Sequence, residues 1–348
     1  MELGIYSFGD SSIDPETGNY VSERQLYKNL LERITLADEV GLNYFGLGEH
    51  HRADYPLSAP VTLLSAAAAV TKQIHLGSAV TVLPTDDPVR VFEQYASLDL
   101  ISEGRAEVTV GTGAFCESYD LFGHERQEIQ PEFTEKLHLL KQLNQGGAID
   151  WNGTHRPPFS VPGVWPRPAN GELDLWVATG ATPESSERAA QLGMNAIYSF
   201  LGNPPASSKH LVDHYRAEAV AAGHDLATMK VGVAGRGLVA SNSAHAKETM
   251  YQHWLPSVVK VSEERGRPIP DRELYEEQAT SNGPIIVGTP NEVADRLAAI
   301  HEHLQHDRHI LHMDIGNVPH ADVMKSIELF GTEVLPQVTH LGFVTARV

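Results

Sequence analysis

The feature that most constrains the fold is residues 42–113, where three strand-like segments alternate with helix-like ones. The strands are predicted at residues 42–48, 74–83 and 105–110. The first is followed by Glu49-His50-His51-Arg52 and the third by Gly111-Thr112-Gly113. In α/β barrels the active site forms on the loops that follow the C-terminal ends of the strands. The stretch therefore predicts an enzyme built on such a barrel.

The same alternation continues along the whole chain, which predicts a parallel sheet with helices outside it. Strands are expected at residues 3–8, 42–48, 74–83, 105–110, 175–178, 194–200, 230–240 and 309–314. Helices are expected at residues 22–40, 59–70 and 89–101, around Leu137, from Pro183 onward and around Leu297. Eight strands predict the fold class α/β, a (β/α)8 TIM barrel with loop insertions, as one domain over residues 1–348.

Two stretches do not fit a plain barrel. Residues 151–172 are rich in proline and glycine, which predicts an ordered connection or a short hairpin rather than a helix. Residues 262–284 are polar and also contain proline and glycine. Loops of this length are usually functional lids or disordered. We therefore treat 151–172 and 262–284 as candidate lids.

Composition excludes several function classes. A formal net charge of −19 argues against nucleic-acid binding, because a phosphate backbone selects basic surfaces. No apolar run approaches the roughly 18 residues of a membrane helix, so no membrane partner is expected. The N-terminus lacks the basic and apolar regions of a signal peptide, and Cys116 is the single cysteine. These features predict a cytoplasmic protein.

Glu49-His50-His51 is the sharpest local signal. Imidazole titrates near neutral pH, so a histidine at a strand end can act as a base, an acid or a hydrogen-bond donor. One alternative is a histidine that only packs and forms hydrogen bonds. Another is a metal site, which would need ligands from other strand ends, and these could come from His309, His312, Asp314, Asp86 and Asp87. No recognised ligand spacing supports a metal, and none is predicted.

Two glycine-containing turns are candidates for binding a phosphate. Gly111-Thr112-Gly113 and Thr179-Gly180-Ala181 each follow a strand, and glycine lets backbone N–H groups approach a ligand closely. The second turn leads into a helix N-terminus, which favours an anion. The alternative for each is an ordinary strand-to-helix turn. No G-x-G-x-x-G follows the first strand, so a dinucleotide fold is not supported.

Several histidines lie near the end of the last expected barrel helix. His301, His303 and His306 are interpreted as a solvated helix end, where cationic side chains favour the helix dipole. His312 is the exception and is expected to be buried on the last strand.

Together these residues resemble the bacterial luciferase-like family of flavin-dependent monooxygenases. The similarity covers essentially the whole chain. It includes Glu49-His50-His51, the strand from Gly77 to Pro84, and the run from Ala96 through Ser102-Glu103-Gly104-Arg105. It extends through Leu121-Phe122-Gly123 and Val287-Gly288-Thr289-Pro290 to Glu333-Val334-Leu335-Pro336. The set is specific, although each motif alone is weak.

The resemblance implies a TIM barrel that binds FMN at the C-terminal strand ends, usually as a homodimer. It implies that His50 is the catalytic histidine. The implied cofactor-binding residues lie beside the flavin ring or around its phosphate, and they are Ala79, Val80, Gly111, Thr112, Gly113, Thr179, Gly180, Ala181 and Ser199. Family members often have a non-proline cis peptide at the positions of Ala79 and Val80, and their dimer interface uses helices equivalent to 59–70 and 89–101. Thr112 departs from the arginine that many relatives carry.

The resulting hypothesis is an FMN-dependent monooxygenase, with reduced FMN as co-substrate and dioxygen oxidising a small organic substrate. His50 would act as a base or a hydrogen-bond donor. Reduced flavin would come from a partner flavin reductase or from direct reduction by NAD(P)H. One alternative is an oxidoreductase on the same fold that depends on the deazaflavin F420 or on NAD(P)H. A non-catalytic flavin-binding protein and a metal-dependent barrel hydrolase are the others.

Overall fold

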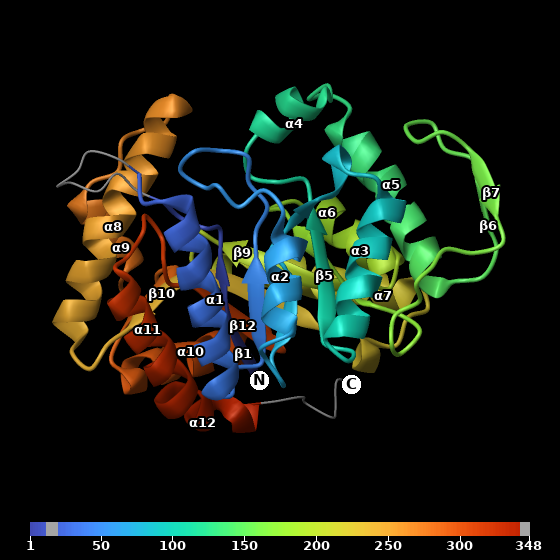
Figure 1. Ribbon diagram of the computed structural model, residues 1–348. Coiled ribbons are helices and arrows are strands. Elements are labelled where there is room, and N and C mark those ends of the chain that lie inside the picture. The colour runs from blue at the N-terminus through green and yellow to red at the C-terminus, as the bar shows by residue number, and fades with distance from the viewer. Residues whose placement is uncertain (12–19, 342–348) are drawn as a thin grey trace.

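Eight parallel strands close into a barrel in the computed structural model, which describes residues 1–11 and 20–341 (Figure 1). Neighbouring strands pair in the order β1-β2-β3-β5-β8-β9-β10-β12, and β12 pairs with β1 to close the ring. The barrel strands are β1 Glu2–Ser7, β2 Tyr44–Leu47, β3 His75–Ser78, β5 Ala106–Gly111, β8 Asp174–Thr179, β9 Asn195–Phe200, β10 Val231–Val239 and β12 Arg308–His312. All eight predicted strands are present, so the predicted barrel is confirmed.

Four further strands lie outside the closed ring. The expected strand 74–83 is divided into β3 and the short β4, Thr81–Val82, and the peptide bond between Ala79 and Val80 is cis. β11, Ile285–Gly288, was not predicted. It pairs with the second half of β10 from Arg236 onward, while the first half pairs with β12. β6, Ile149–Trp151, and β7, Phe159–Val161, form an antiparallel hairpin.

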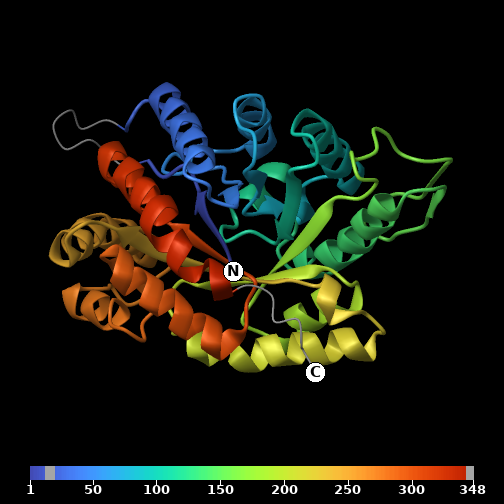
Figure 2. The same cartoon turned by 90° about the horizontal axis from the view of Figure 1, so that it is seen from below.

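Helices surround the strands on the outside, which Figure 2 shows in a view from below the barrel. They are α1 Glu23–Glu39, α2 Pro60–Ala68, α3 Pro88–Ile101, α4 Glu117–Phe122, α5 Ile129–Gln145, α6 Pro183–Gln191, α7 Lys209–Ala221, α8 Ser243–Glu264, α9 Arg272–Gln278, α10 Pro290–Leu304, α11 His320–Leu329 and α12 Leu335–Val338. No helix in the described ranges combines the length and the apolar character needed to cross a membrane.

Local sequence signals explain where the predicted helices begin and end. The Ser22 side chain accepts a hydrogen bond from the backbone N–H of Gln25 at the start of α1. Gly41, with φ of 81°, follows the end of that helix, where a left-handed conformation favours glycine. α10 starts with a capping box in which Thr289 and Glu292 satisfy each other's backbone N–H groups.

The two candidate lids have different structures. A hairpin forms as expected, but it spans residues 149–161 and so begins two residues before the stretch 151–172. Both views place β6 and β7 at the outer edge of the molecule, beyond α5 (Figures 1 and 2). Residues 262–284 were expected to be one long loop, which is wrong, because α8 continues to Glu264 and α9 occupies 272–278. Asp271 caps α9 by accepting a hydrogen bond from the N–H of Leu274.

Side chains fill the interior of the barrel in layers, as in other closed parallel barrels. The middle layer is formed by Tyr6, Tyr44, Trp176, Ile197, Ala234 and Ile310. Because side chains on one face of a strand recur every second residue, the residues two positions further along form the next layer toward the strands' C-terminal ends. That layer includes Phe8, Ala178, Ser199, Arg236 and His312.

An ion-pair network lies on the other side of the middle layer, toward the start of the strands. Arg308 makes a bidentate contact with Glu107, at 2.5 and 2.9 Å, and also contacts Glu2 at 2.6 Å. Its guanidinium lies 4.6 Å from the ring centroids of both Tyr44 and Trp176. Although burial opposes it, the Arg308 charge lowers the pKa of Glu107 well below its usual value.

The prediction of a solvated histidine cluster is wrong for His301 and His306, which are buried. Gln305, with φ of 52°, ends α10 and turns the chain directly into β12, so His306 packs against His309 instead of facing water. Burial lowers the pKa of His309 to about 3 and that of His306 well below its usual value. His303 is exposed, as expected.

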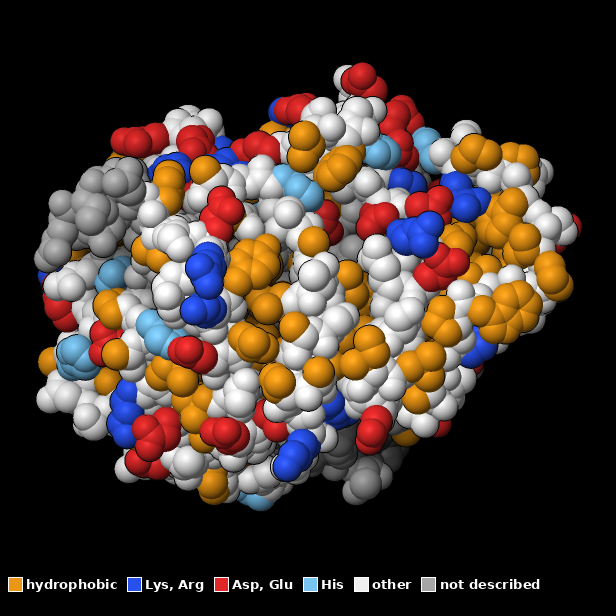
Figure 3. Space-filling view, viewed as in Figure 1, with side chains coloured by type: hydrophobic (Ala, Val, Ile, Leu, Met, Phe, Trp, Pro, Cys, Tyr) orange, Lys and Arg blue, Asp and Glu red, His pale blue; other side chains and the backbone are white. Residues whose placement is uncertain are grey.

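Within one chain, α2 is buried on one side. Leu63, Leu64, Ala67 and Ala68 face the interior, whereas Thr62, Ala66, Ala69 and Val70 on this helix and the turn that follows it are exposed. Leu100 and Ile101 of α3 are also exposed. Figure 3 shows hydrophobic side chains across the middle of this face, over α2 and α3. This face is called the α2–α3 face below.

Candidate functional site

His50 lies at the end of β2 inside a group of aromatic rings, which we call the aromatic cage. The rings of Phe8, Tyr55 and Phe115 have centroids 4.8, 5.2 and 5.2 Å from that of His50. His50 is only 7% exposed, and its Nε2 atom has no hydrogen-bond partner among the described residues. Burial lowers the pKa of His50 to about 3, so the imidazole is neutral at pH 7.

His51 has a different environment, although it is the next residue. Its Nε2 lies 2.9 Å from Oε1 of Glu49, and its ring packs against Phe122. The other carboxylate oxygen of Glu49 accepts a hydrogen bond from the N–H of Val82 at 2.8 Å. Glu49 therefore ties His51 to the segment after β3, whereas the buried Nε2 of His50 has no partner in the described chain.

The turn after β5 packs tightly against its neighbours. A Cβ atom added to Gly111 would lie 3.1 Å from Cγ2 of Val80 and 3.3 Å from Cβ of Ala178. Gly113 has φ of 80°, a conformation that favours glycine. The structure therefore brings Val80 and Gly111 together, and β5 and β8 are paired neighbours, so both glycine-containing turns lie on one edge of the barrel.

The individual turn residues differ in what they can offer a ligand. The hydroxyl of Thr179 donates to the carbonyl of Ile197 at 3.0 Å, so it is already used. Gly180 and Ala181 are exposed, as is Ser199 at the end of β9. Thr112 is half-buried, and its carbonyl accepts a hydrogen bond from the hydroxyl of Tyr119.

These features fit a flavin with a phosphate. A buried imidazole nitrogen without a partner is available for a bound group. At Gly180 the nearest atom to an added Cβ is Oγ of Ser185 at 3.7 Å, so this turn leaves space for a ligand beside its backbone. The half-buried Ala79 and Val80 are close to Gly111 and would lie beside a ring placed there.

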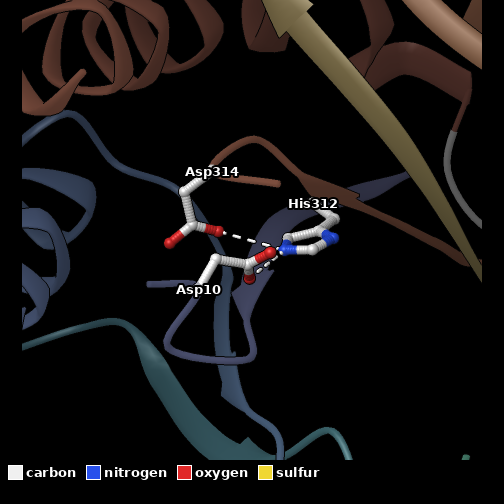
Figure 4. Close-up of side chains that lie close together, drawn as sticks. All are labelled: Asp10, His312 and Asp314. Atoms are coloured by element: carbon white, nitrogen blue, oxygen red, sulfur yellow. Dashed lines mark hydrogen bonds and ion pairs between the residues drawn. The ribbon is translucent and has the colours of Figure 1, made fainter. Parts of the chain in front are cut away.

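Asp10, His312 and Asp314 form a buried cluster next to the aromatic cage (Figure 4). Nε2 of His312 lies 2.8 Å from Oδ2 of Asp10 and 3.2 Å from Oδ1 of Asp314. Oδ2 of Asp314 accepts from Nη1 of Arg33 and from the hydroxyl of Ser7, both at 2.6 Å. The two carboxylates are thus balanced by two cations.

Electrostatics explain why this cluster holds a proton. Burial alone would lower the pKa of His312, but the charges of Asp10 and Asp314 outweigh it and raise the pKa to about 9. The three side chains have the residue types of a metal site, yet the charges of protonated His312 and of Arg33 already balance those of the two carboxylates. The alternative metal site around His50 is not assembled, because the His309 side chain points out of the barrel, where it contacts His306, and Asp86 and Asp87 are on the loop before α3.

Several residues at this end of the barrel were not identified from the sequence. Phe8, Tyr55, Phe115 and Arg236 surround His50 or line a cavity of about 520 Å³ above the middle layer. The sequence contained one signal that could have identified such a residue, because Arg236 lies inside a predicted apolar strand. Phe115 is held by contacts with the guanidinium groups of Arg52 and Arg265, at 4.6 and 4.9 Å from its ring centroid.

Known proteins share this fold over nearly its full length. The oxygenase component of a flavin-dependent trigonelline monooxygenase from Acinetobacter baylyi is 24% identical over 339 residues, which cover 90% of this chain and 91% of that relative. The crystal structure of the monooxygenase RslO1 from Streptomyces bottropensis is 25% identical, with a TM-score of 0.81, over 97% of this chain and 99% of that one.

A reductase also shares the fold. The coenzyme F420-dependent tetrahydromethanopterin reductase from Methanopyrus kandleri is 19% identical, with a TM-score of 0.73, and the match covers 96% of this chain and 98% of that one. The family model of the luciferase-like monooxygenases matches residues 1–306. With this match and the closed barrel, the chain belongs to the luciferase-like monooxygenase family.

Proposed function

We propose that the protein is an FMN-dependent monooxygenase that uses reduced FMN and dioxygen to oxidise a small organic substrate. The observation that carries this proposal is the buried Nε2 of His50, which has no partner in the described chain and lies among rings at the barrel mouth. Reduced FMN supplies the electrons that activate dioxygen, while the protein supplies position and protection from water. The similarity to an oxygenase component supports a separate flavin reductase as the source of reduced FMN.

The environment of His50 favours one of the two roles expected for it. A general base is most effective when its pKa is near the working pH, whereas burial lowers the pKa of His50 to about 3. A neutral imidazole still donates or accepts a hydrogen bond through Nε2. In this proposal His50 therefore binds and orients the reacting group through a hydrogen bond, and the aromatic cage excludes water from it.

The experiment that tests the reaction follows the oxygen atom. The protein is supplied with FMN, NADH, a flavin reductase and ¹⁸O₂, together with a panel of small organic compounds. Incorporation of one ¹⁸O atom into a product is expected only when all components are present. Reduction of a compound by reduced F420 without dioxygen would instead identify the alternative, a deazaflavin-dependent oxidoreductase on the same fold.

A substitution at Thr112 tests where the flavin phosphate binds. Thr112→Arg places a cation beside the backbone of the Gly111–Gly113 turn, and a charge-assisted contact with a phosphate contributes about 1 kcal/mol or more. We therefore expect tighter FMN binding in a fluorescence titration, by about fivefold or more, and unchanged binding of riboflavin, which has no phosphate. An equal effect on both ligands would remove Thr112 from the phosphate site.

The α2–α3 face supports a homodimer. Ala66 is exposed at its centre, next to exposed Val70. Ala66→Glu should give monomers in light scattering because it puts a charge into an apolar interface. Ala67 and Ala68 are unsuitable for this test because they are buried within the chain. Ala217→Glu on the exposed side of α7 is the matched control, and a dimeric Ala66→Glu variant would place the interface elsewhere.

A further inference from the structure

The 520 Å³ cavity at the barrel mouth has an unusual charge distribution. It lies between the ends of β9 and β10 on one side and α8 and α9 on the other. Its wall contains the guanidinium groups of Arg236, Arg265 and Arg267. None of the described residues that line it is an aspartate or a glutamate. A cavity wall with three arginines and no carboxylate is unusual in a chain whose formal net charge is −19.

Arg236 is the deepest of the three cations. It follows Ala234 of the middle layer by two residues, so its side chain belongs to the layer at the barrel mouth, beside His312 on the neighbouring strand. Its Nη1 donates to the carbonyl of Leu201 at 2.7 Å, and its Nε is buried without a partner in the described chain. Burial lowers the pKa of Arg236, as expected for a cation in apolar surroundings.

Several other half-buried arginines are held by three or more backbone carbonyls each, as for Arg105, Arg167 and Arg296, whereas Arg236 donates to one. Others pair with carboxylates. Arg33 pairs with Asp314, Arg308 with Glu107, and Arg52 with Asp54. Within residues 1–11 and 20–341, Arg236 has no ion pair. The nearby carboxylate of Asp10 is held by His312 and by the N–H of Gly316, at 2.8 and 2.9 Å. Arg236 is therefore a cation for which the described chain provides no dedicated anion.

The rest of the cavity wall indicates that the uncharged part of a ligand would be apolar. Apolar and aromatic side chains cover most of it, and these are Phe8, Phe115, Leu201, Trp254, Val258 and Leu274. Trp254 is 2% exposed, and its Nε1–H has no partner in the described chain. The carbonyl oxygen of the Gln278 side chain is likewise buried and unpaired there. Cavities of this size and character bind small organic molecules.

We propose that this cavity binds a small organic carboxylate with an aromatic or aliphatic body, and that its carboxylate pairs with Arg236. A guanidinium presents parallel N–H groups that match a carboxylate, and the apolar wall strengthens that contact by excluding water. Arg265 and Arg267, which are exposed, add positive charge at the rim and attract the anion. The claim that this carboxylate is the substrate rests on the proposed function. The claim that the cavity binds a carboxylate does not.

The binding test uses two probes of nearly equal shape, indole-3-acetate and indole-3-acetamide, in calorimetry without flavin. We expect the wild-type protein to bind the carboxylate about tenfold or more tightly than the amide. Arg236→Met should remove most of that preference and leave amide binding within about threefold, and Arg236→Lys should retain part of it. Arg24→Met on the exposed side of α1 is the matched control.

A second variant keeps the test decisive if Arg236→Met does not fold. Leu274→Glu places a negative charge at the exposed edge of the cavity, on α9. It should weaken carboxylate binding about tenfold and affect the amide much less. Equal binding of both probes to the wild type, or no carboxylate binding at about 5 mM, would overturn the proposal.

FMN titrations separate this site from the flavin phosphate site. Arg236→Met should leave the FMN dissociation constant within about threefold, because the phosphate turns are on β5 and β8. If the variant instead weakens FMN but not riboflavin, Arg236 binds the flavin phosphate and the substrate-anion proposal is wrong. A protein that shows the carboxylate preference but no FMN-dependent oxygenation would retain this site and lose the proposed function.

Discussion

Replacing His50 with alanine is expected to slow the reaction of protein-bound reduced FMN with dioxygen by about 10²-fold, the usual effect of losing one preorganised hydrogen bond to the transition state. The reason is that Nε2 of His50 is the ring nitrogen at the barrel mouth that the described chain leaves without a partner. Stopped-flow absorbance measures the rate without needing the substrate. The FMN dissociation constant should change by less than about threefold, because the phosphate turns are unchanged.

His51→Ala is the matched control for this prediction. The imidazole of His51 is bound to Glu49 and packs on Phe122, so its loss should mainly lower stability. The rate with dioxygen should stay near that of the wild type. If His51→Ala folds but is inactive and His50→Ala reacts normally, the site has been assigned to the wrong histidine.

The largest effect on stability is expected for Arg308→Met. Glu107 is 0% exposed, and removal of its bidentate partner leaves a buried carboxylate whose remaining ion pair among the described residues is with His75, at 2.9 Å. Breaking a buried ion pair in this way costs about 3–5 kcal/mol of unfolding free energy. Arg308 also packs between the rings of Tyr44 and Trp176, so its loss removes contacts on both faces. Urea unfolding followed by circular dichroism gives the difference.

A double variant separates the charge from the packing. Arg308→Met combined with Glu107→Leu removes both charges, and replacing a buried ion pair with apolar residues is often close to neutral. The double variant should therefore recover much of the loss and be more stable than Arg308→Met alone. Arg272→Met, which breaks exposed ion pairs with Glu248 and Glu276, is the control and should not change the midpoint measurably. A double variant less stable than the single one would contradict this account.

The barrel could be predicted because parallel barrel strands are buried on both faces and therefore form nearly continuous apolar runs. The segments at β1, β2, β8 and β10 have this character, and glycine or proline separates many of the helices from the strands. β11 was missed because four residues give too short a pattern, and its pairing depends on the extra length of β10.

Because these strands are buried on both faces, the sequence does not show which of their side chains point into the barrel. A strand without alternation does not show that Phe8 and Arg236 face the barrel interior, and their place became clear only from the pairing register. His306 was misjudged because its burial depends on the turn at Gln305. An apolar helix such as α2 could be covered by its own chain or by a second copy, and its sequence cannot distinguish the two.

The candidate site was predicted in part. The sequence made His50, Gly111 and Gly180 candidates, because acid, imidazole and glycine residues at the ends of predicted strands can be recognised without a structure. The aromatic cage and the cavity could not be found in this way, because Phe8, Tyr55, Phe115 and Arg236 come from four separate segments that only the closed barrel brings together. The roles of the named site residues stay predictions.

A single equilibrium titration tests the central claim, that this barrel mouth is an FMN site. The purified protein is titrated separately with FMN, FAD and F420, and the change in cofactor fluorescence gives each dissociation constant. We expect FMN to bind at least about tenfold more tightly than FAD, because the two glycine-containing turns are proposed to hold one phosphate and no dinucleotide fingerprint follows the first strand. We also expect FMN to bind more tightly than F420, the cofactor of the alternative oxidoreductase. Tighter binding of F420 than of FMN would contradict the central claim and identify a deazaflavin-dependent enzyme.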